Sequence, residues 1–127
     1  MKRLGLLAVV VATALAGCGG ESNEVADVGE LQRCLIAADL LTDSGPGVDL
    51  VAGEASQGAV QVLFDNNEIQ IAAAEHSEEA EGIERTYEMF GGGSVERLGT
   101  VVIAATYEPS DEEIDPIRAC LGEQGIG

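Results

Sequence analysis

Two cysteines, Cys34 and Cys120, constrain the fold of this chain more than any other feature of its sequence. Each falls on the apolar stripe of a predicted amphipathic helix, and these are the first and the last helices of the chain. A disulfide between them would close a loop of about 87 residues and pin the two helices together. The alternative is a pair of separate buried thiols. The choice depends on whether the chain reaches an oxidising compartment.

The N-terminal residues have the order of charges and apolar residues that is typical of a secretory signal. Two basic residues come first, residues 4–16 carry no charge, and small residues precede Cys18. The uncharged run is too short for a transmembrane helix, which needs roughly 20 apolar residues. We therefore expect residues 1–17 to be a signal peptide. An exported chain with an even pair of further cysteines favours the disulfide.

Residues 15–18 read Leu-Ala-Gly-Cys, which resembles the lipobox that ends the signal peptide of bacterial lipoproteins. The resemblance implies that the sulfur of Cys18 receives a diacylglyceryl group and that the chain is cleaved before this residue. It also implies an extracytoplasmic location, with the bacterial membrane or envelope as a partner through the lipid anchor. The alternative is an ordinary secreted protein with a stray cysteine. Residues 18–26 are then the lipidated cysteine and a flexible tether, and residues 27–127 a single small domain.

The domain is predicted to alternate helices and strands in the order α-β-β-α-β-α. Residues 48–52 are an optional further strand, and residues 95–98 either extend the strand that follows or form a separate one. We expect an α+β fold of two layers, in which helices pack on one face of a small, mainly antiparallel sheet of three or four strands. The predicted elements are helices at 27–41, 77–90 and 110–121 and strands within 59–74 and at 100–107.

Local signals mark where these elements begin and turn. Asp27 and Glu30, like Ser110 and Glu113, have the spacing of a helix N-cap and its partner three residues on. Residues 59–74 alternate apolar valines and isoleucines with polar residues, Gln61 and Gln70 among them, which is typical of a hairpin with one solvated face. The expected turn is Asn66-Asn67.

The charge balance excludes one class of function. All 23 acidic residues lie after Cys18, against four arginines, which gives residues 18–127 a net charge of −19. Such a surface is repelled by phosphate backbones, so we expect no nucleic-acid binding. It suits a cationic partner, a cation-rich medium or simple solubility. The partner that we predict is a protein with a basic surface or a membrane complex.

A second acidic feature is the cluster at residues 75–84. If the helix extended back to residue 75, Glu79 would share a face with Glu75 and with His76. These three residues are candidate ligands for Ca²⁺ or another divalent cation. The alternative is a solvated helix start, where negative charge is favoured by the helix dipole. No other cofactor is expected.

The sequence favours a protein that is not an enzyme. His76 is the only histidine, and no serine lies in a Gly-x-Ser-x-Gly turn, so a nucleophilic site lacks its usual parts. We therefore predict a membrane-anchored, non-enzymatic binding or accessory module. The alternative is a lipoprotein that binds divalent cations through residues 75–84.

Overall fold

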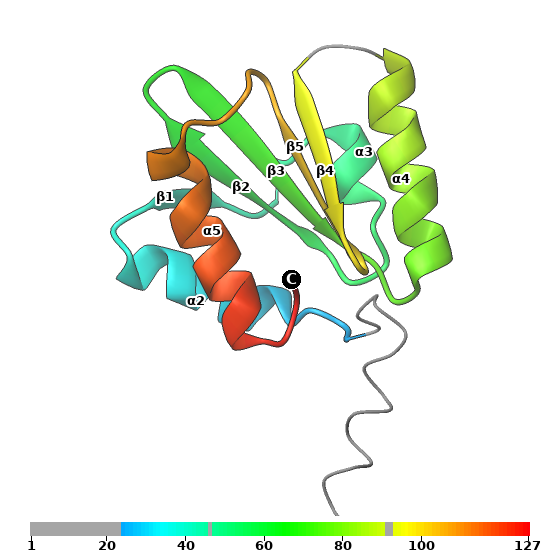
Figure 1. Cartoon of the computed structure of the whole chain (residues 1–127), viewed down its shortest axis with the longest axis horizontal. Helices are drawn as coiled ribbons and strands as arrows, with labels where there is room; N and C mark the ends of the chain where they lie inside the picture. The colour runs from blue at the N-terminus through cyan, green and yellow to red at the C-terminus, as the bar shows by residue number, and fades with distance from the viewer. Residues whose placement is uncertain (1–23, 46, 91–92) are drawn as a thin grey trace, which may run out of the picture.

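The computed structural model describes residues 24–45, 47–90 and 93–127, which form an antiparallel sheet with helices packed against it (Figure 1). In this part of the chain the strands lie in the order β1-β2-β3-β5-β4, and every neighbouring pair is antiparallel. The elements in chain order are α2 (Val28–Ala37), β1 (Leu41–Asp43), α3 (Leu50–Gly53), β2 (Ala59–Phe64), β3 (Asn67–Ala73), α4 (Ser77–Phe90), β4 (Ser94–Leu98), β5 (Val101–Ala105) and α5 (Asp111–Glu123).

The two faces of the sheet are covered by different helices. Successive residues of a strand point to opposite faces, and directly paired residues share a face. The face that carries Val60, Ile71 and Ile103 packs against α2 and α5. The opposite face, which carries Ala72 and Val102, packs against α3 and α4. Figure 1 shows α2 and α5 together on one side of the sheet and α3 and α4 on the other.

The predicted α+β class, with a mainly antiparallel sheet and helices packed against it, is confirmed. Two details differ from the expectation. The described residues form five strands rather than three or four. The helices cover both faces rather than one, because alanines and valines make the second face apolar as well.

A turn at Gly99 makes β4 and β5 a hairpin. Gly99 has a φ of 61°, which favours glycine, and Leu98 pairs with Val101 across the turn. Residues 95–98 therefore belong to a separate edge strand and do not extend β5. Because β5 lies between β3 and β4, the crossover through α4 leads from β3 to the far edge of the sheet.

The segment after α2 also differs from the prediction. The helix was expected to continue to Leu41, but it ends at Ala37, and Asp39 has a φ of 67°. Leu41 instead begins β1, which pairs with β2. Residues 48–52, expected as an optional strand, overlap α3, whose N-cap Asp49 accepts a hydrogen bond from the Ala52 N–H.

The other local predictions are confirmed, with a shift at the hairpin turn. The Asp27 side chain accepts a hydrogen bond from the Glu30 N–H, and Ser110 and Glu113 form a capping box. In the hairpin of β2 and β3, Phe64 pairs with Asn67. The turn is therefore Asp65-Asn66, one residue earlier than expected.

The start of the described chain is fastened to the domain. Ala26 is buried in the main core, and the Thr100 hydroxyl donates to the Glu24 carbonyl at 2.6 Å. The Asp27 N–H donates to Gln124 Oε1 at 2.7 Å, and Gln124 Nε2 donates back to the Asp27 carbonyl at 3.1 Å. Residues 24–26, expected to end the tether, thus pack on the domain beside the β4–β5 turn.

Candidate functional site

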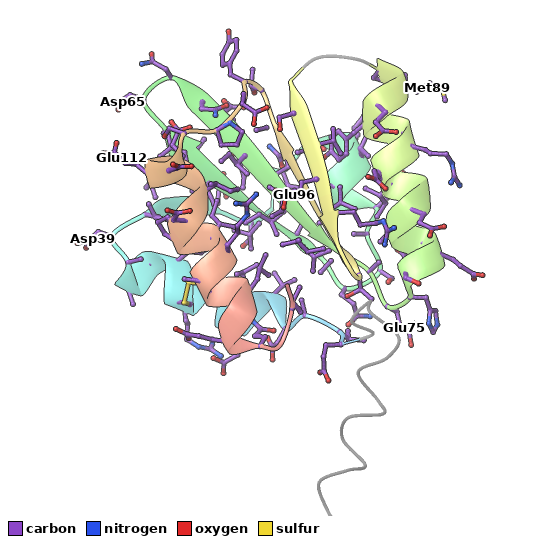
Figure 2. All side chains as sticks on the ribbon, viewed as in Figure 1. Asp39, Asp65, Glu75, Met89, Glu96 and Glu112 are labelled. Carbon is purple, nitrogen blue, oxygen red and sulfur yellow. A yellow bond between two sulfur atoms is a disulfide. The ribbon has the colours of Figure 1, made fainter. Side chains whose placement is uncertain are left out.

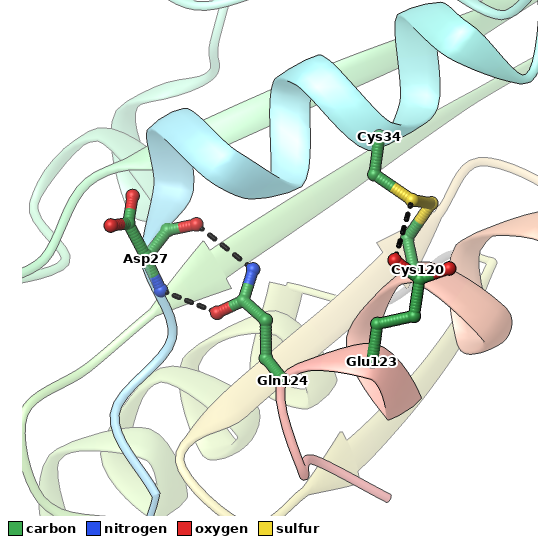
Figure 3. Close-up of a disulfide and its surroundings, with 5 residues drawn as sticks. All are labelled: Asp27, Cys34, Cys120, Glu123 and Gln124. Carbon is green, nitrogen blue, oxygen red and sulfur yellow. Dashed lines mark hydrogen bonds between the residues drawn. A yellow bond between two sulfur atoms is a disulfide. The ribbon is translucent and has the colours of Figure 1, made fainter.

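The predicted disulfide between Cys34 and Cys120 is present and joins α2 to α5 (Figure 3). The two Cα atoms lie 5.9 Å apart across a sequence separation of 86 residues. Cys120 is buried and Cys34 is half-buried against the same core. Both cysteines were expected on buried helix faces, so the expectation holds fully for Cys120 and in part for Cys34.

The surroundings of the disulfide indicate a structural role. Glu123 Oε1 lies 3.8 Å from Cys34 Sγ, which is a contact only, because a disulfide sulfur has no proton to donate. The paired hydrogen bonds between Asp27 and Gln124 hold the same two helices together at their ends (Figure 3). The disulfide is therefore a clamp between α2 and α5.

The acidic cluster at residues 75–84 lies at the N-terminal end of α4. Glu79 turns its carboxylate toward Ser56 and accepts from the Ser56 hydroxyl at 2.6 Å, the Ser56 N–H at 2.8 Å and the Glu75 N–H at 3.3 Å. Burial raises the pKa of Glu79, but these hydrogen bonds outweigh it and hold the pKa below its ordinary value. Glu79 thus fastens α4 to the loop before β2.

The candidate metal ligands do not converge. His76 Nε2 lies 3.9 Å from Glu75 Oε1, and the His76 side chain is exposed. Within residues 24–45, 47–90 and 93–127, no three His, Cys, Asp or Glu side chains are arranged to hold a metal ion. Cation binding by Glu75, His76 and Glu79 stays a prediction that this arrangement does not favour.

The role of Glu79 has a pH signature. We expect Ser56→Ala to lower the free energy of unfolding by about 1 kcal/mol at neutral pH, because Glu79 loses a hydroxyl donor. The pKa of Glu79 is lower in the folded than in the unfolded chain. The stability contributed by its hydrogen bonds is therefore fully present above an ordinary glutamate pKa of about 4.3, and it is lost as the pH falls through the folded pKa.

Urea unfolding at neutral pH and at an acidic pH that protonates Glu79 in the folded protein measures this effect. Ser44→Ala, at an exposed serine, is the control and should change little at either pH. If Ser56→Ala lowered the free energy of unfolding by the same amount at both pH values, the role of Glu79 would be contradicted.

A cavity of about 360 Å³ lies on the α3/α4 face of the sheet, and we call it the polar cleft. α3 and α4 cover Ala72 and Val102 on that face. Nearer the β2–β3 turn, the same face carries the polar residues Gln61, Gln70 and Glu68 together with Leu63 and Ala104. The lining side chains that carry polar atoms are Asp49, Gln61, Glu68, Gln70, Tyr87, Ser94 and Thr106.

Two buried glutamines form the floor of the polar cleft. Gln61 and Gln70 pair directly across β2 and β3, and each is only 6% exposed. Gln70 Oε1 accepts from the Asp49 N–H at 3.3 Å, and Gln61 Nε2 donates to Glu68 Oε1 at 3.4 Å. Gly47 passes close above, where a Cβ atom would lie 3.0 Å from Gln61 Oε1. Two primary amides are thus held beneath a loop, next to the cavity.

Acidic side chains surround the mouth of the polar cleft. The Tyr87 hydroxyl donates to both Asp49 carboxylate oxygens, at 2.8 and 3.0 Å. Burial, together with this carboxylate, raises the pKa of Tyr87 above its ordinary value, so the phenol stays protonated. Asp49 is also the N-cap of α3. Glu68, in contrast, is exposed at the mouth and has only the long hydrogen bond from Gln61.

Sequence reasoning missed this cleft. Gln61 and Gln70 alternate with apolar residues, a pattern that predicts a solvated face, but α3, α4 and the loop before them cover that face. The signal that could have revealed it is the pairing itself, because two glutamines opposite each other in a hairpin share one face.

Cys18, the predicted lipidation site, lies outside the described residues. Among the helices that the structure describes, none has the length and apolar character needed to cross a membrane.

The fold defines a disulfide-clamped, acidic α+β domain with a cavity on one face of its sheet. Comparisons with family models, with curated proteins and with solved structures gave no match. The function is therefore argued from the chain itself.

Proposed function

We propose that this protein is a lipid-anchored, extracytoplasmic binding module that is not an enzyme and that recognises a partner with a basic surface. The observation that carries the proposal is the lipobox-like sequence ending at Cys18, only a few residues before the folded domain begins. Five residues separate Cys18 from Glu24, so a fully extended chain places these two residues at most about 22 Å apart. The domain would therefore stay close to the bilayer surface.

The charge of the domain supports a basic partner. Four arginines against 23 acidic residues give residues 18–127 a net charge of −19. Acidic side chains are spread over the domain: Figure 2 labels Asp39, Asp65 and Glu75 in connecting segments and Glu112 on α5. Such a field accelerates encounter with a cationic surface and disfavours acidic partners.

The point at which the N-terminal chain joins the domain supports a module whose polar cleft faces away from the bilayer. The Glu24 carbonyl accepts a hydrogen bond from the Thr100 hydroxyl, and the Thr100 carbonyl accepts one from the Ala74 N–H. The chain therefore joins the domain at the end of the sheet where β3 ends. Glu68 is at the start of β3, and this seven-residue strand spans about 20 Å. In an anchored chain, the cleft would thus lie at the end of the sheet away from the bilayer.

Membrane attachment is tested with Cys18→Ser, which removes the acceptor of the lipid. We expect the wild-type chain to sediment with membranes and to enter the detergent phase on phase separation. We expect Cys18→Ser to lose this partition almost completely, because the acyl chains on the Cys18 sulfur supply the apolar contact with the bilayer. The double variant Cys34→Ala/Cys120→Ala is the control, since it also loses cysteines but keeps the lipid acceptor and should remain in the membrane fraction.

Partner binding is tested by crosslinking the wild-type chain in its native membrane and identifying the captured proteins at low and at high salt. A basic protein captured at low salt and lost at high salt would support the proposal. Recovery of no partner at either salt concentration, or detergent partition of Cys18→Ser equal to that of the wild type, would overturn it.

A further inference from the structure

The floor of the polar cleft has hydrogen-bonding capacity that the described residues do not use. Gln70 is 94% buried, its Oε1 is held by the Asp49 N–H, and no hydrogen bond from its Nε2 to another described residue is found. Gln61 Nε2 donates to Glu68, and its Oε1 has no hydrogen-bond donor in the described part of the chain. Buried polar groups are normally hydrogen-bonded, so an amide donor and an amide acceptor next to one cavity point to a ligand that supplies both partners.

The charge at the mouth restricts the ligand further. Asp49 and Glu68 both line the cleft, and none of its lining residues is a lysine or an arginine. Asp49 is already satisfied by Tyr87 and by the Ala52 N–H. Glu68 is exposed and its side chain has one long hydrogen bond. It is therefore the carboxylate that is best able to form an ion pair with a cationic ligand. An anionic ligand would meet two carboxylates, whereas a cationic ligand would complement them.

We propose that the polar cleft binds an arginine or lysine residue, whose cationic head is held by Glu68 and Gln61 Oε1 while a carbonyl of the same residue accepts from Gln70 Nε2. The proposal rests on the proposed function and deepens it, because it names the chemical group through which a basic partner is recognised. A bare metal ion would satisfy Glu68 but has no acceptor for Gln70 Nε2. A guanidinium or ammonium group with a carbonyl on the same molecule satisfies all three groups. The volume of about 360 Å³ suits one such residue.

The test is isothermal titration calorimetry on the full-length chain in detergent, with N-acetyl-arginine amide as the probe. N-acetyl-citrulline amide is the matched control probe, since it has nearly the same shape without the charge. Free arginine distinguishes the source of the ligand: tighter binding of the capped probe indicates a residue within a polypeptide, and tighter binding of free arginine indicates the amino acid itself. Whichever of the two probes binds more tightly, saturable binding supports recognition of a cationic head by the polar cleft.

The matched variants are Glu68→Gln in the cleft and Glu112→Gln on the exposed start of α5. Both variants remove one negative charge. Any difference between their affinities for the arginine probe is therefore due to the polar cleft and not to the net charge of the domain. We expect saturable binding of the arginine probe and binding of the citrulline probe at least about tenfold weaker. We expect Glu68→Gln to weaken arginine binding by about ten- to hundredfold and Glu112→Gln to leave it within about twofold.

The inference is overturned if the arginine probe does not bind saturably, if citrulline binds equally well, or if the two variants weaken binding to the same extent. Its failure is distinct from failure of the proposed function. A basic partner that crosslinks to Glu68→Gln as well as to the wild type would refute the cleft and leave the proposed function standing. Arginine binding in the cleft, with no partner captured in the membrane, would refute the proposed function and leave the polar cleft standing as a binding site.

Discussion

Removing the Cys34–Cys120 disulfide is expected to lower the free energy of unfolding by about 4–5 kcal/mol. The disulfide closes a loop with a sequence separation of 86 residues, which covers most of the described domain. In the chain-entropy model, such a link restricts the unfolded chain far more than the folded one. Because the net stability of a small domain is typically about 5–15 kcal/mol, this is a large share of the total.

The measurement is urea unfolding of the wild-type chain with and without reductant, beside the double variant Cys34→Ala/Cys120→Ala. Alanine is preferred to serine because Cys120 is buried and a serine hydroxyl there would need a partner. Reduction and the double variant should agree in size, apart from the small cavity that the variant leaves. A loss below about 1 kcal/mol in both would contradict the role of the disulfide as the main clamp.

The second large effect is expected for Ile71→Ala, at about 3–4 kcal/mol. Ile71 lies in the middle of β3, pairs with Val60 and Ile103, and is fully buried in the core beneath α2 and α5. Truncation removes apolar contacts and leaves a cavity in the central strand, where neighbours on both sides limit relaxation.

Ile36→Ala is the matched control, because it deletes the same atoms from an isoleucine that is 55% exposed on α2. We expect it to change stability by less than about 0.5 kcal/mol. Urea unfolding of both variants provides the comparison. Losses of similar size at the two positions would mean that Ile71 is not at the centre of the core.

Features fixed by neighbouring residues could be predicted from the sequence. The caps at Asp27 and Ser110 form as expected because their partners are three residues away. The hairpin of β2 and β3 follows from alternation within 15 residues or so of chain. The pairing of Cys34 with Cys120 could be predicted because both lie on the inner faces of helices that share one core.

Features that depend on distant packing could not be predicted in the same way. Ala72 and Val102 give the second face of the sheet its apolar character, but single small residues do not reveal that a helix covers them. The stripe of α2 continues in sequence to Leu41, yet pairing with β2 makes this residue start a strand. In both cases tertiary contacts outweigh the local pattern.

The candidate site shows the same limit. Glu79 has the sequence position of a cation ligand, but Ser56, 23 residues away, uses its carboxylate. Gln61 and Gln70 have the pattern of solvated residues, but the loop that contains Gly47 and Asp49 covers them. The two outcomes depend on where α3 and the loops on either side of it fold, and a short stretch of sequence does not determine that.

The most direct test of an anchored, disulfide-clamped module is the intact mass of the chain extracted from membranes without reductant. We predict a chain that begins at Cys18, carries a diacylglyceryl group on that residue, and gains the mass of two hydrogen atoms on reduction. A membrane-extracted chain with an unmodified Cys18, or a mass that reduction leaves unchanged, would contradict this prediction.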